Sequence, residues 1–278
     1  MLSAEDWADV HGVTSLDDEL YILHCRQTDQ IDVYSKSNFT FLRHLSVPGL
    51  SKHGIQDITA STGLKCLLIA DSDRRCLHKV VKDDKILPVI WHLPAKPYGL
   101  SAINTETCQT STYNTGYVLV ACYEEGPQSR TGTLIELNAV GHRVRLITVL
   151  MPWIESLWHA VMLNSGQFVI SYRSFWCATG EKITIVDDIG VVKKSYGECW
   201  WAPWGRELVK GPCQMAVDND GFVIIADNEN NGLVLLNPSL EIVRRIPTKN
   251  RPRWLHLDQN SRRLFVGHES NAVSILQL

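Results

Sequence analysis

The stretch of this chain that decides its fold reads Gly211-Pro-Cys-Gln-Met-Ala-Val-Asp-Asn-Asp-Gly-Phe-Val-Ile-Ile-Ala-Asp-Asn-Glu-Asn-Asn-Gly-Leu-Val-Leu-Leu-Asn237, and it continues after a turn as Leu240-Glu-Ile-Val-Arg-Arg-Ile246. Four short apolar or alternating runs are separated here by turns rich in Asn, Asp and Gly, a pattern typical of β-strands. Because Gly and Asn tolerate the positive φ that tight hairpins need, the turns fix the strand register. The stretch therefore predicts one four-stranded antiparallel meander.

A single meander of this size cannot bury both faces of its sheet, so similar units are expected to stack beside it. The same order of apolar triplet, turn, apolar run, Ala-Asp and second turn recurs between His53 and Val81. Looser copies are found at Pro97-Tyr-Gly-Leu100, Trp158-His-Ala-Val161 and Pro252-Arg-Trp-Leu-His-Leu-Asp258. The sequence thus predicts a protein built of repeated β-sheet units.

The wording around Pro212-Cys-Gln-Met-Ala-Val-Asp218, Gly221 and Ala226-Asp-Asn228 resembles the NHL repeat, whose units form the blades of six-bladed β-propellers. The resemblance extends to Ile55–Val81 and is looser elsewhere. It implies an all-β fold, a six-bladed β-propeller of NHL-type four-stranded antiparallel blades, similar to the propeller domains of tripartite-motif NHL proteins. A WD40-type propeller is the alternative, disfavoured because the chain has no Gly-His … Trp-Asp signature.

One propeller domain accounts for all 278 residues, since six units of roughly 40 to 55 residues use the whole length. The expected blades span residues 10–47, 55–90, 98–149, 157–196, 212–246 and 253–278. The last blade has only three strands of its own. Closed propellers avoid an unpaired edge by borrowing a strand from the other terminus, so residues 1–9 are expected to complete this blade.

Charge and hydropathy argue against several function classes. A net charge of −3 does not favour attraction of the whole surface to DNA or to an anionic membrane. No apolar run approaches the ~18 residues of a membrane span, and the first residues lack the pattern of a signal peptide. We expect a cytoplasmic, monomeric propeller. The NHL resemblance implies that it could belong to a longer multidomain chain, as NHL propellers often do.

The eight cysteines are expected to be reduced and mostly buried, because Cys66 and Cys76 fall at opposite ends of one predicted hairpin, too far apart for a disulfide. No Cys-x-x-Cys pair occurs in the sequence, so a zinc site of the usual spacing is not indicated. We predict no cofactor and no bound metal.

Three tryptophans within five positions mark the connection into the fifth unit, which reads Cys199-Trp-Trp-Ala-Pro-Trp-Gly-Arg206. Trp and Arg dominate hot spots at protein interfaces, so the leading prediction is a scaffold that binds a protein partner through its loop face. The predicted contact residues are Trp200, Trp201, Trp204, Arg206, Trp176 and Arg173. In the alternative, the indoles fold back and plug the channel mouth.

Binding of single-stranded RNA is the first alternative function. Basic and aromatic residues of the predicted loop face could neutralise phosphates and stack bases, and some NHL propellers of the tripartite-motif family bind RNA there. The candidate residues are Arg74, Arg75, Lys96, Tyr98, Lys210, Arg251 and Arg253. Acidic residues share this face and dilute the basic ring, so an ordinary solvated surface of mixed charge is the favoured explanation.

A metal-dependent propeller hydrolase or lyase is the second alternative. The side chains expected to face the channel are His11, Gln56, Tyr98, His159, Gln214 and Trp254. A lactonase-like site would place Glu, Asn and Asp there to hold calcium, and an amidating-lyase-like site would need three histidines on zinc. The set meets neither requirement, so we predict a protein that is not an enzyme and name no catalytic residue.

Asp71 and Asp227 each follow an Ile-Ala pair at the end of a predicted second strand. Carboxylates at such positions accept hydrogen bonds from backbone N–H groups of the following turn. We therefore interpret both as structural residues.

Overall fold

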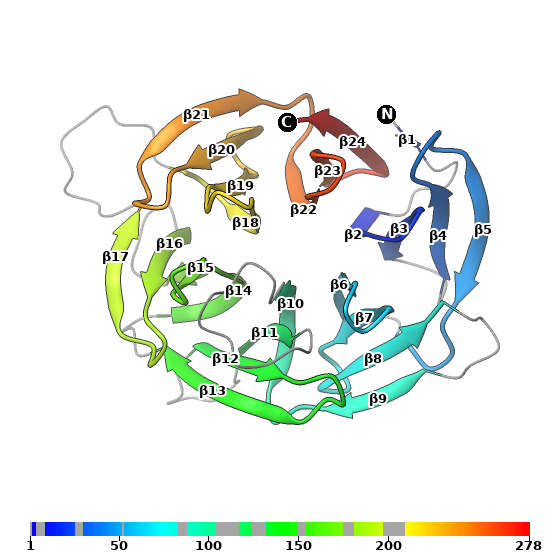
Figure 1. Ribbon diagram of the computed structural model, residues 1–278, viewed down its shortest axis with the longest axis horizontal. Helices are drawn as coiled ribbons and strands as arrows, with labels where there is room; N and C mark the ends of the chain where they lie inside the picture. The colour runs from blue at the N-terminus through cyan, green and yellow to red at the C-terminus, as the bar shows by residue number, and fades with distance from the viewer. Residues whose placement is uncertain are drawn as a thin grey trace.

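The computed structural model describes residues 2–3, 9–25, 30–51, 53–82, 88–103, 117–123, 132–149, 154–174, 181–196 and 209–278. Within these ranges the chain folds into six four-stranded antiparallel sheets. Figure 1 shows the sheets arranged around a central axis, with one innermost strand from each sheet facing that axis. The predicted all-β, six-bladed propeller is therefore confirmed.

The first three blades are β2 (Asp9–Leu16), β3 (Glu19–Cys25), β4 (Gln30–Ser35) and β5 (Phe41–Ser46), then β6 (Ile55–Ser61), β7 (Cys66–Asp71), β8 (Cys76–Val81) and β9 (Val89–His92), then β10 (Lys96–Ile103), β11 (Tyr117–Tyr123), β12 (Gly132–Leu137) and β13 (Arg143–Val149). The last three blades are β14 (Ile154–Met162), β15 (Phe168–Ser174), β16 (Glu181–Val186) and β17 (Val192–Tyr196), then β18 (Pro212–Val217), β19 (Val223–Asp227), β20 (Gly232–Leu236) and β21 (Ile242–Pro247), then β22 (Pro252–Asp258), β23 (Arg263–His268), β24 (Ala272–Gln277) and β1 (Leu2–Ser3).

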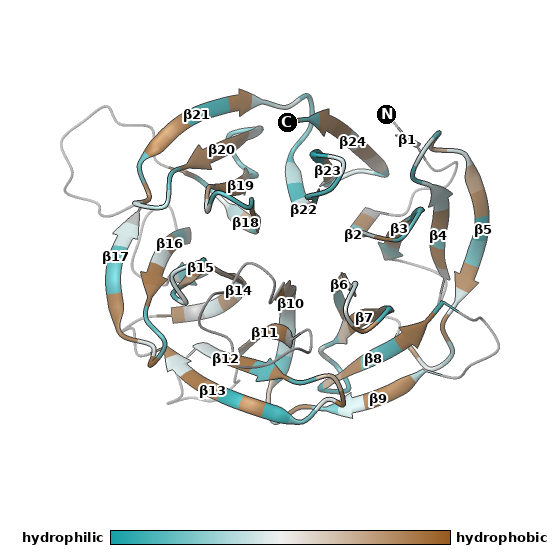
Figure 2. Cartoon of the chain, viewed as in Figure 1, coloured by the Kyte–Doolittle hydropathy of each residue, from teal (hydrophilic) through white to brown (hydrophobic). Residues whose placement is uncertain are grey.

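Burial falls from the second strand of a blade to its outer strand. All residues of β7 are buried, whereas β21 is largely exposed. A strand covered on both faces by neighbouring blades needs a continuous apolar run, which explains Cys66-Leu-Leu-Ile-Ala. Figure 2 shows polar and apolar residues mixed along the outer strands. Their short length and polar content protect these edges from pairing with other chains.

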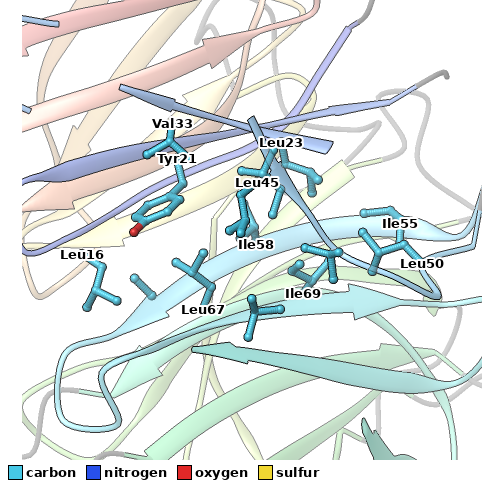
Figure 3. Packing of buried hydrophobic residues seen from close by; sticks show 14 residues of the cluster. Leu16, Tyr21, Leu23, Val33, Leu45, Leu50, Ile55, Ile58, Leu67 and Ile69 are labelled. Atoms are coloured by element: carbon cyan, nitrogen blue, oxygen red, sulfur yellow. The ribbon is translucent and has the colours of Figure 1, made fainter. Parts of the chain in front are cut away.

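The core consists of apolar clusters between adjacent blades. In the cluster between blades one and two, Leu23 and Leu45 of blade one pack against Ile55, Ile58 and Ile69 of blade two, as Figure 3 shows. Full burial of one such side chain stabilises the fold by ~1.5–3 kcal/mol. Each blade therefore depends on both neighbours for its stability.

The sixth blade is completed by the N-terminus. Strand β1 pairs antiparallel with β24, with Leu2 opposite Val273 and Ser3 opposite Ala272. Figure 1 places the two ends of the chain at the same blade. The strand lies where the argument from an unpaired edge puts it, and it closes the ring with only two residues.

The inter-blade connections and the turns between second and third strands share one face of the propeller. Backbone N–H groups of Ser72, Asn228 and Glu269 donate to the carbonyls of Gly54 (2.7 Å), Gly211 (3.2 Å) and Arg251 (2.9 Å), respectively. These bonds tie the two kinds of loop together in blades two, five and six. We call this side the loop face.

Asp71 and Asp227 organise these loops as structural residues. Asp71 Oδ1 accepts a bond from the Arg74 N–H of the following turn (3.1 Å), as predicted. For Asp227 the backbone donor is instead Lys210 (2.7 Å), which precedes the strand pair.

In the part of the chain that is described, no helix is long and apolar enough to cross a membrane.

Candidate binding site at the channel mouth

Each innermost strand carries an irregularity near its start, on the side of the loop face. The register breaks between Val10 and Gly12 in β2 and at corresponding positions of β6, β10, β14, β18 and β22. A β-bulge leaves a residue unpaired and re-aims its side chain. The side chains re-aimed in this way are those of His11, Gln56, Tyr98, Trp158, Cys213 and Arg253.

All six of these residues line one pocket at the axis, together with Gly99, Gln214 and Trp254. We call this pocket the channel mouth. Its volume is about 40 Å³, on a measure in which one water takes roughly 10–15 Å³. The mouth therefore has space for a small polar group such as a carboxylate.

Aromatic rings and one guanidinium form the wall of the mouth. Arg253 lies over the rings of Trp254 and Trp158, with its guanidinium carbon 4.9 Å and 5.8 Å from the ring centroids. His11 stacks on Trp254 at 5.3 Å, and Tyr98 meets Trp158 edge-on at 6.1 Å. Such contacts hold the guanidinium in a fixed position at modest entropic cost.

Two polar groups of the mouth are positioned to meet a ligand. The Trp158 Nε1–H is buried and has no hydrogen-bond partner, which is costly unless a ligand or water accepts from it. The Arg253 Nη1 atom lies 3.5 Å from Glu269 Oε1, and Arg251 reaches the other oxygen of the same carboxylate at 3.5 Å. The two arginines thus share one carboxylate, each at the long distance of 3.5 Å. The Arg253 guanidinium can therefore also bind a second acceptor.

Below the mouth lies a buried layer that crosses the axis, which we call the axial bridge. Gln214 of blade five donates from Nε2 to Asp57 Oδ1 of blade two at 2.6 Å, and its Oε1 accepts from the N–H of Leu255 in blade six at 2.8 Å. Asp57 also accepts from the N–H groups of Ile58 (2.8 Å) and Leu100 (2.7 Å). The bridge therefore connects blades two, three, five and six.

Asp57 is only 1% exposed, and its environment disfavours a charge. Burial raises the pKa of this carboxyl to about 7, against the opposing effect of its three N–H donors. None of the described residues that line the mouth above it is a carboxylate.

The prediction that His159 faces the channel is wrong. The bulge in β14 makes Trp158 the unpaired residue, so His159 turns into the space between blades and is only 3% exposed. Its Nδ1 accepts from the Met215 N–H (3.3 Å), which leaves the ring proton on Nε2, next to Ser101 Oγ and the Leu100 carbonyl. Burial lowers the pKa of His159 to about 4. The other five residues expected at the channel do line the mouth.

The basic residues proposed for RNA binding are spread over the loop face. Tyr98 and Arg253 line the mouth, and Arg251 shares Glu269 with Arg253. The Arg74 guanidinium donates to the Gly49 carbonyl. Arg75 and Lys210 are exposed and Lys96 is half-buried at the start of β10. They form no continuous ring of unengaged cations, because Asp73, Glu229 and Glu269 are exposed among them.

The residues proposed for partner binding fall mostly outside the described residues. This holds for Trp200, Trp201, Trp204, Arg206 and Trp176. Arg173 is described and lies exposed near the end of β15. The predicted Trp platform therefore stays a prediction.

Comparison with solved structures identifies the fold. The chain resembles the hydrazine synthase of Kuenenia stuttgartiensis with 11% identity and a TM-score of 0.68, over 100% of this chain and 97% of the other. A Xanthomonas campestris gluconolactonase matches with 13% identity and a TM-score of 0.63, over 98% and 86%. A chain of a nidogen–laminin complex matches with 8% identity and a TM-score of 0.64, over 89% and 84%.

These similarities concern the propeller fold alone, because the identities are low and the three structures differ in kind. No protein-family profile matches the sequence, and no curated protein is similar to it.

Proposed function

We propose that this protein is a non-catalytic binding module that takes a partner protein on its loop face, with an acidic group of the partner anchored in the channel mouth. The observation that carries this proposal is the pairing of an unpartnered buried donor, Trp158 Nε1–H, with the Arg253 guanidinium in one small pocket. Trp158 needs an acceptor and Arg253 can take one in addition to Glu269, and together they suit a carboxylate.

The volume of the mouth favours a peptide over RNA. A space of about 40 Å³ takes an Asp or Glu carboxylate or a C-terminal carboxylate, whereas a stacked base needs an open aromatic face. Trp254 already stacks with His11 and lies under the Arg253 guanidinium.

The NHL resemblance and the Trp-rich connection belong to the same proposal. Blade five has the turn chemistry of an NHL unit, and we assign the blades to this type. The connection that holds Trp200, Trp201 and Trp204 ends at Lys210, on the loop face. We assign to it the outer part of the partner contact, around the anchoring mouth.

The test is a peptide array probed with purified protein, in which each peptide is presented with a free C-terminal carboxylate, with an amide, or with internal Asp and Glu residues. We expect binding to acid-bearing peptides. It should fall at least tenfold for Arg253→Ala and severalfold for Trp158→Phe, which keeps an aromatic ring but removes the N–H donor.

Arg244→Ala is the matched control, because Arg244 is an exposed arginine on the outer strand β21. Equal loss of binding in Arg244→Ala would point to general charge attraction rather than the mouth. Salt-steep binding of single-stranded RNA with no preference for acidic peptides would replace this proposal with the nucleic-acid alternative.

A further inference from the structure

Blade two contains a buried cluster of three groups that are all able to bind a metal. Asp71 ends β7, Cys76 lies opposite it at the start of β8, and His78 follows two residues later on the same face of β8. The side chains of all three are completely buried. One ligand atom from each lies within 4.8 Å of the other two.

The distances within this cluster match the edges of a tetrahedral zinc site. Cys76 Sγ lies 3.6 Å from His78 Nε2, and His78 Nε2 lies 3.3 Å from Asp71 Oδ2. Metal bonds of about 2.3 Å to sulfur and about 2.0–2.1 Å to nitrogen and oxygen, at tetrahedral angles, separate S from N by about 3.6 Å and N from O by about 3.3 Å. Two of the three edges of the cluster therefore match a zinc site, and the third, between the Cys76 and Asp71 ligand atoms, is within 4.8 Å.

Other bonds already hold the carboxylate in the orientation that a metal ligand needs. Ser51 donates from Oγ to Asp71 Oδ1 at 2.7 Å and from its backbone N–H to Oδ2 at 3.0 Å. The Arg74 N–H donates to Oδ1 as well. Such outer contacts to a ligating carboxylate are a regular feature of metal sites.

Blade five has an aspartate, Asp227, at the position of Asp71, but there an arginine balances the charge of the carboxylate. There Asp227 Oδ2 pairs with the Arg245 guanidinium at 3.2 Å. The strand register places Val234 opposite Arg245, and it places Ile90 at the corresponding position of blade two, opposite His78. Blade two thus lacks this arginine, and the Arg74 guanidinium is directed to the Gly49 carbonyl.

The third strands of the two blades, β8 and β20, differ at the positions next to these aspartates. Asp227 faces Gly232 with Val234 beyond it, where Asp71 faces Cys76 with His78 beyond it. The two groups found only in blade two are both metal ligands, and they accompany the loss of the cation that blade five supplies. In place of a guanidinium, the Asp71 carboxylate has hydrogen bonds to Ser51, to the Arg74 N–H and to His78.

We propose that blade two holds a Zn²⁺ ion, bound by Asp71 Oδ2, Cys76 Sγ and His78 Nε2, with a neutral water molecule in the fourth tetrahedral position. On binding, the Cys76 thiol loses its proton to solvent, and His78 binds as a neutral ring with its proton on Nδ1. One dication then balances one carboxylate and one thiolate, so the buried site is neutral overall. The ion takes the place in blade two that Arg245 has in blade five.

The experiment measures metal content and thermal stability of the full chain. The protein is unfolded with a chelator under reducing conditions, refolded with or without Zn²⁺, and freed of excess metal by gel filtration. We expect about one tightly bound zinc per chain and a melting temperature several degrees higher with zinc than without it. Cys76→Ala and His78→Ala should lose both the bound zinc and the zinc-dependent rise.

Cys66→Ala and Cys213→Ala are the controls, because they remove a buried thiol of the same blade and the half-buried thiol of the mouth. Both should retain the zinc. Refolding the wild type with Co²⁺ gives a second measurement that needs no variant, since a cobalt thiolate has a charge-transfer band in the near ultraviolet. The proposal fails if the refolded wild type binds no zinc and shows no such band. It also fails if Cys76→Ala binds zinc as well as Cys66→Ala.

Discussion

The channel mouth and the axial bridge are built from neighbouring residues of the same strands, yet they have opposite properties. Gln56, Trp158 and Cys213 line the mouth, while the next residue in each case, Asp57, His159 and Gln214, has less than a tenth of its surface exposed. In blades two and four the bulges create this division, because they re-aim Gln56 and Trp158 and return Asp57 and His159 to the ladder. In blade five the break covers both Cys213 and Gln214, so Gln214 reaches the mouth as well as the bridge.

The comparison shows that, in this fold, a residue placed to bind a ligand and a residue that holds the blades together can be direct neighbours in the sequence. Side chains of the mouth touch neighbouring blades mainly through ring contacts, such as those of Arg253 with Trp158 and of His11 with Trp254. A side chain in the axial bridge connects blades that are far apart in sequence, as Asp57 and Gln214 do across 157 positions. Stability should therefore respond to the bridge, and binding should respond to the mouth.

Protonation of Asp57 gives the largest expected effect. Its pKa is about 7 in the folded protein against 3.8 ordinarily, so the folded state takes up this proton more readily than the unfolded chain. The resulting stabilisation is complete below about pH 4 and is lost as the pH rises through about 7. The folded and unfolded pKa values differ by roughly three units, which corresponds to about 4 kcal/mol of unfolding free energy.

This prediction is checked by urea unfolding of the wild type and of Asp57→Asn from pH 5 to pH 8. The variant should gain in unfolding free energy relative to the wild type as the pH rises. Both proteins contain the buried His159 and His256, so the titration of these histidines cancels in the comparison. A difference that stays constant over this range would show that Asp57 does not titrate in it.

Asp57→Ala tests the axial bridge directly. The change leaves the N–H groups of Ile58, Leu100 and Gln214 without their acceptor, and relief of the buried charge offsets part of that penalty. We expect a net loss of about 3 kcal/mol in unfolding free energy at pH 7. The adjacent mouth variant Gln56→Ala should cost less than about 1 kcal/mol. Equal losses in the two variants would remove the distinction between mouth and bridge.

Gln214→Met gives the smallest of these effects, because methionine keeps the length of the side chain while removing its hydrogen bonds. The Leu255 N–H loses its acceptor, and Asp57 loses one of three donors. A loss of about 2 kcal/mol is expected by chemical denaturation. Cys213→Ala, one residue away at the mouth, should cost less; the reverse order would contradict the assignment of these two neighbours.

The fold could be predicted because its determinants are local. The Asn, Asp and Gly turns of residues 211–246 set a meander, and the positive φ of Gly221 (84°) and Asn231 (51°) is the conformation that those residues permit. The need to complete the last blade also follows from its strand count. Neither inference requires knowledge of a distant contact.

The site could be predicted only in part, because its determinants are not local. Nothing in Leu157-Trp-His159 shows which residue the bulge leaves unpaired, so His159 was placed in the channel instead of Trp158. Asp57 gives no signal at all, since its partner is on the opposite blade. The Asp71, Cys76 and His78 cluster was missed because a Cys-x-His pair on a strand differs from the Cys-x-x-Cys spacing that usually marks zinc.

The two-residue strand β1 has a consequence for how this protein is made. Leu2 can meet Val273 only after the chain has been synthesised as far as β24, so this strand pair cannot form before the rest of blade six exists. Until then the face of blade one that packs on blade six, and the outer edge of β24, stay open to wrong partners. A circular permutant that begins at β2 and carries β1 after β24 would make this pairing local, and it should close faster and aggregate less during refolding.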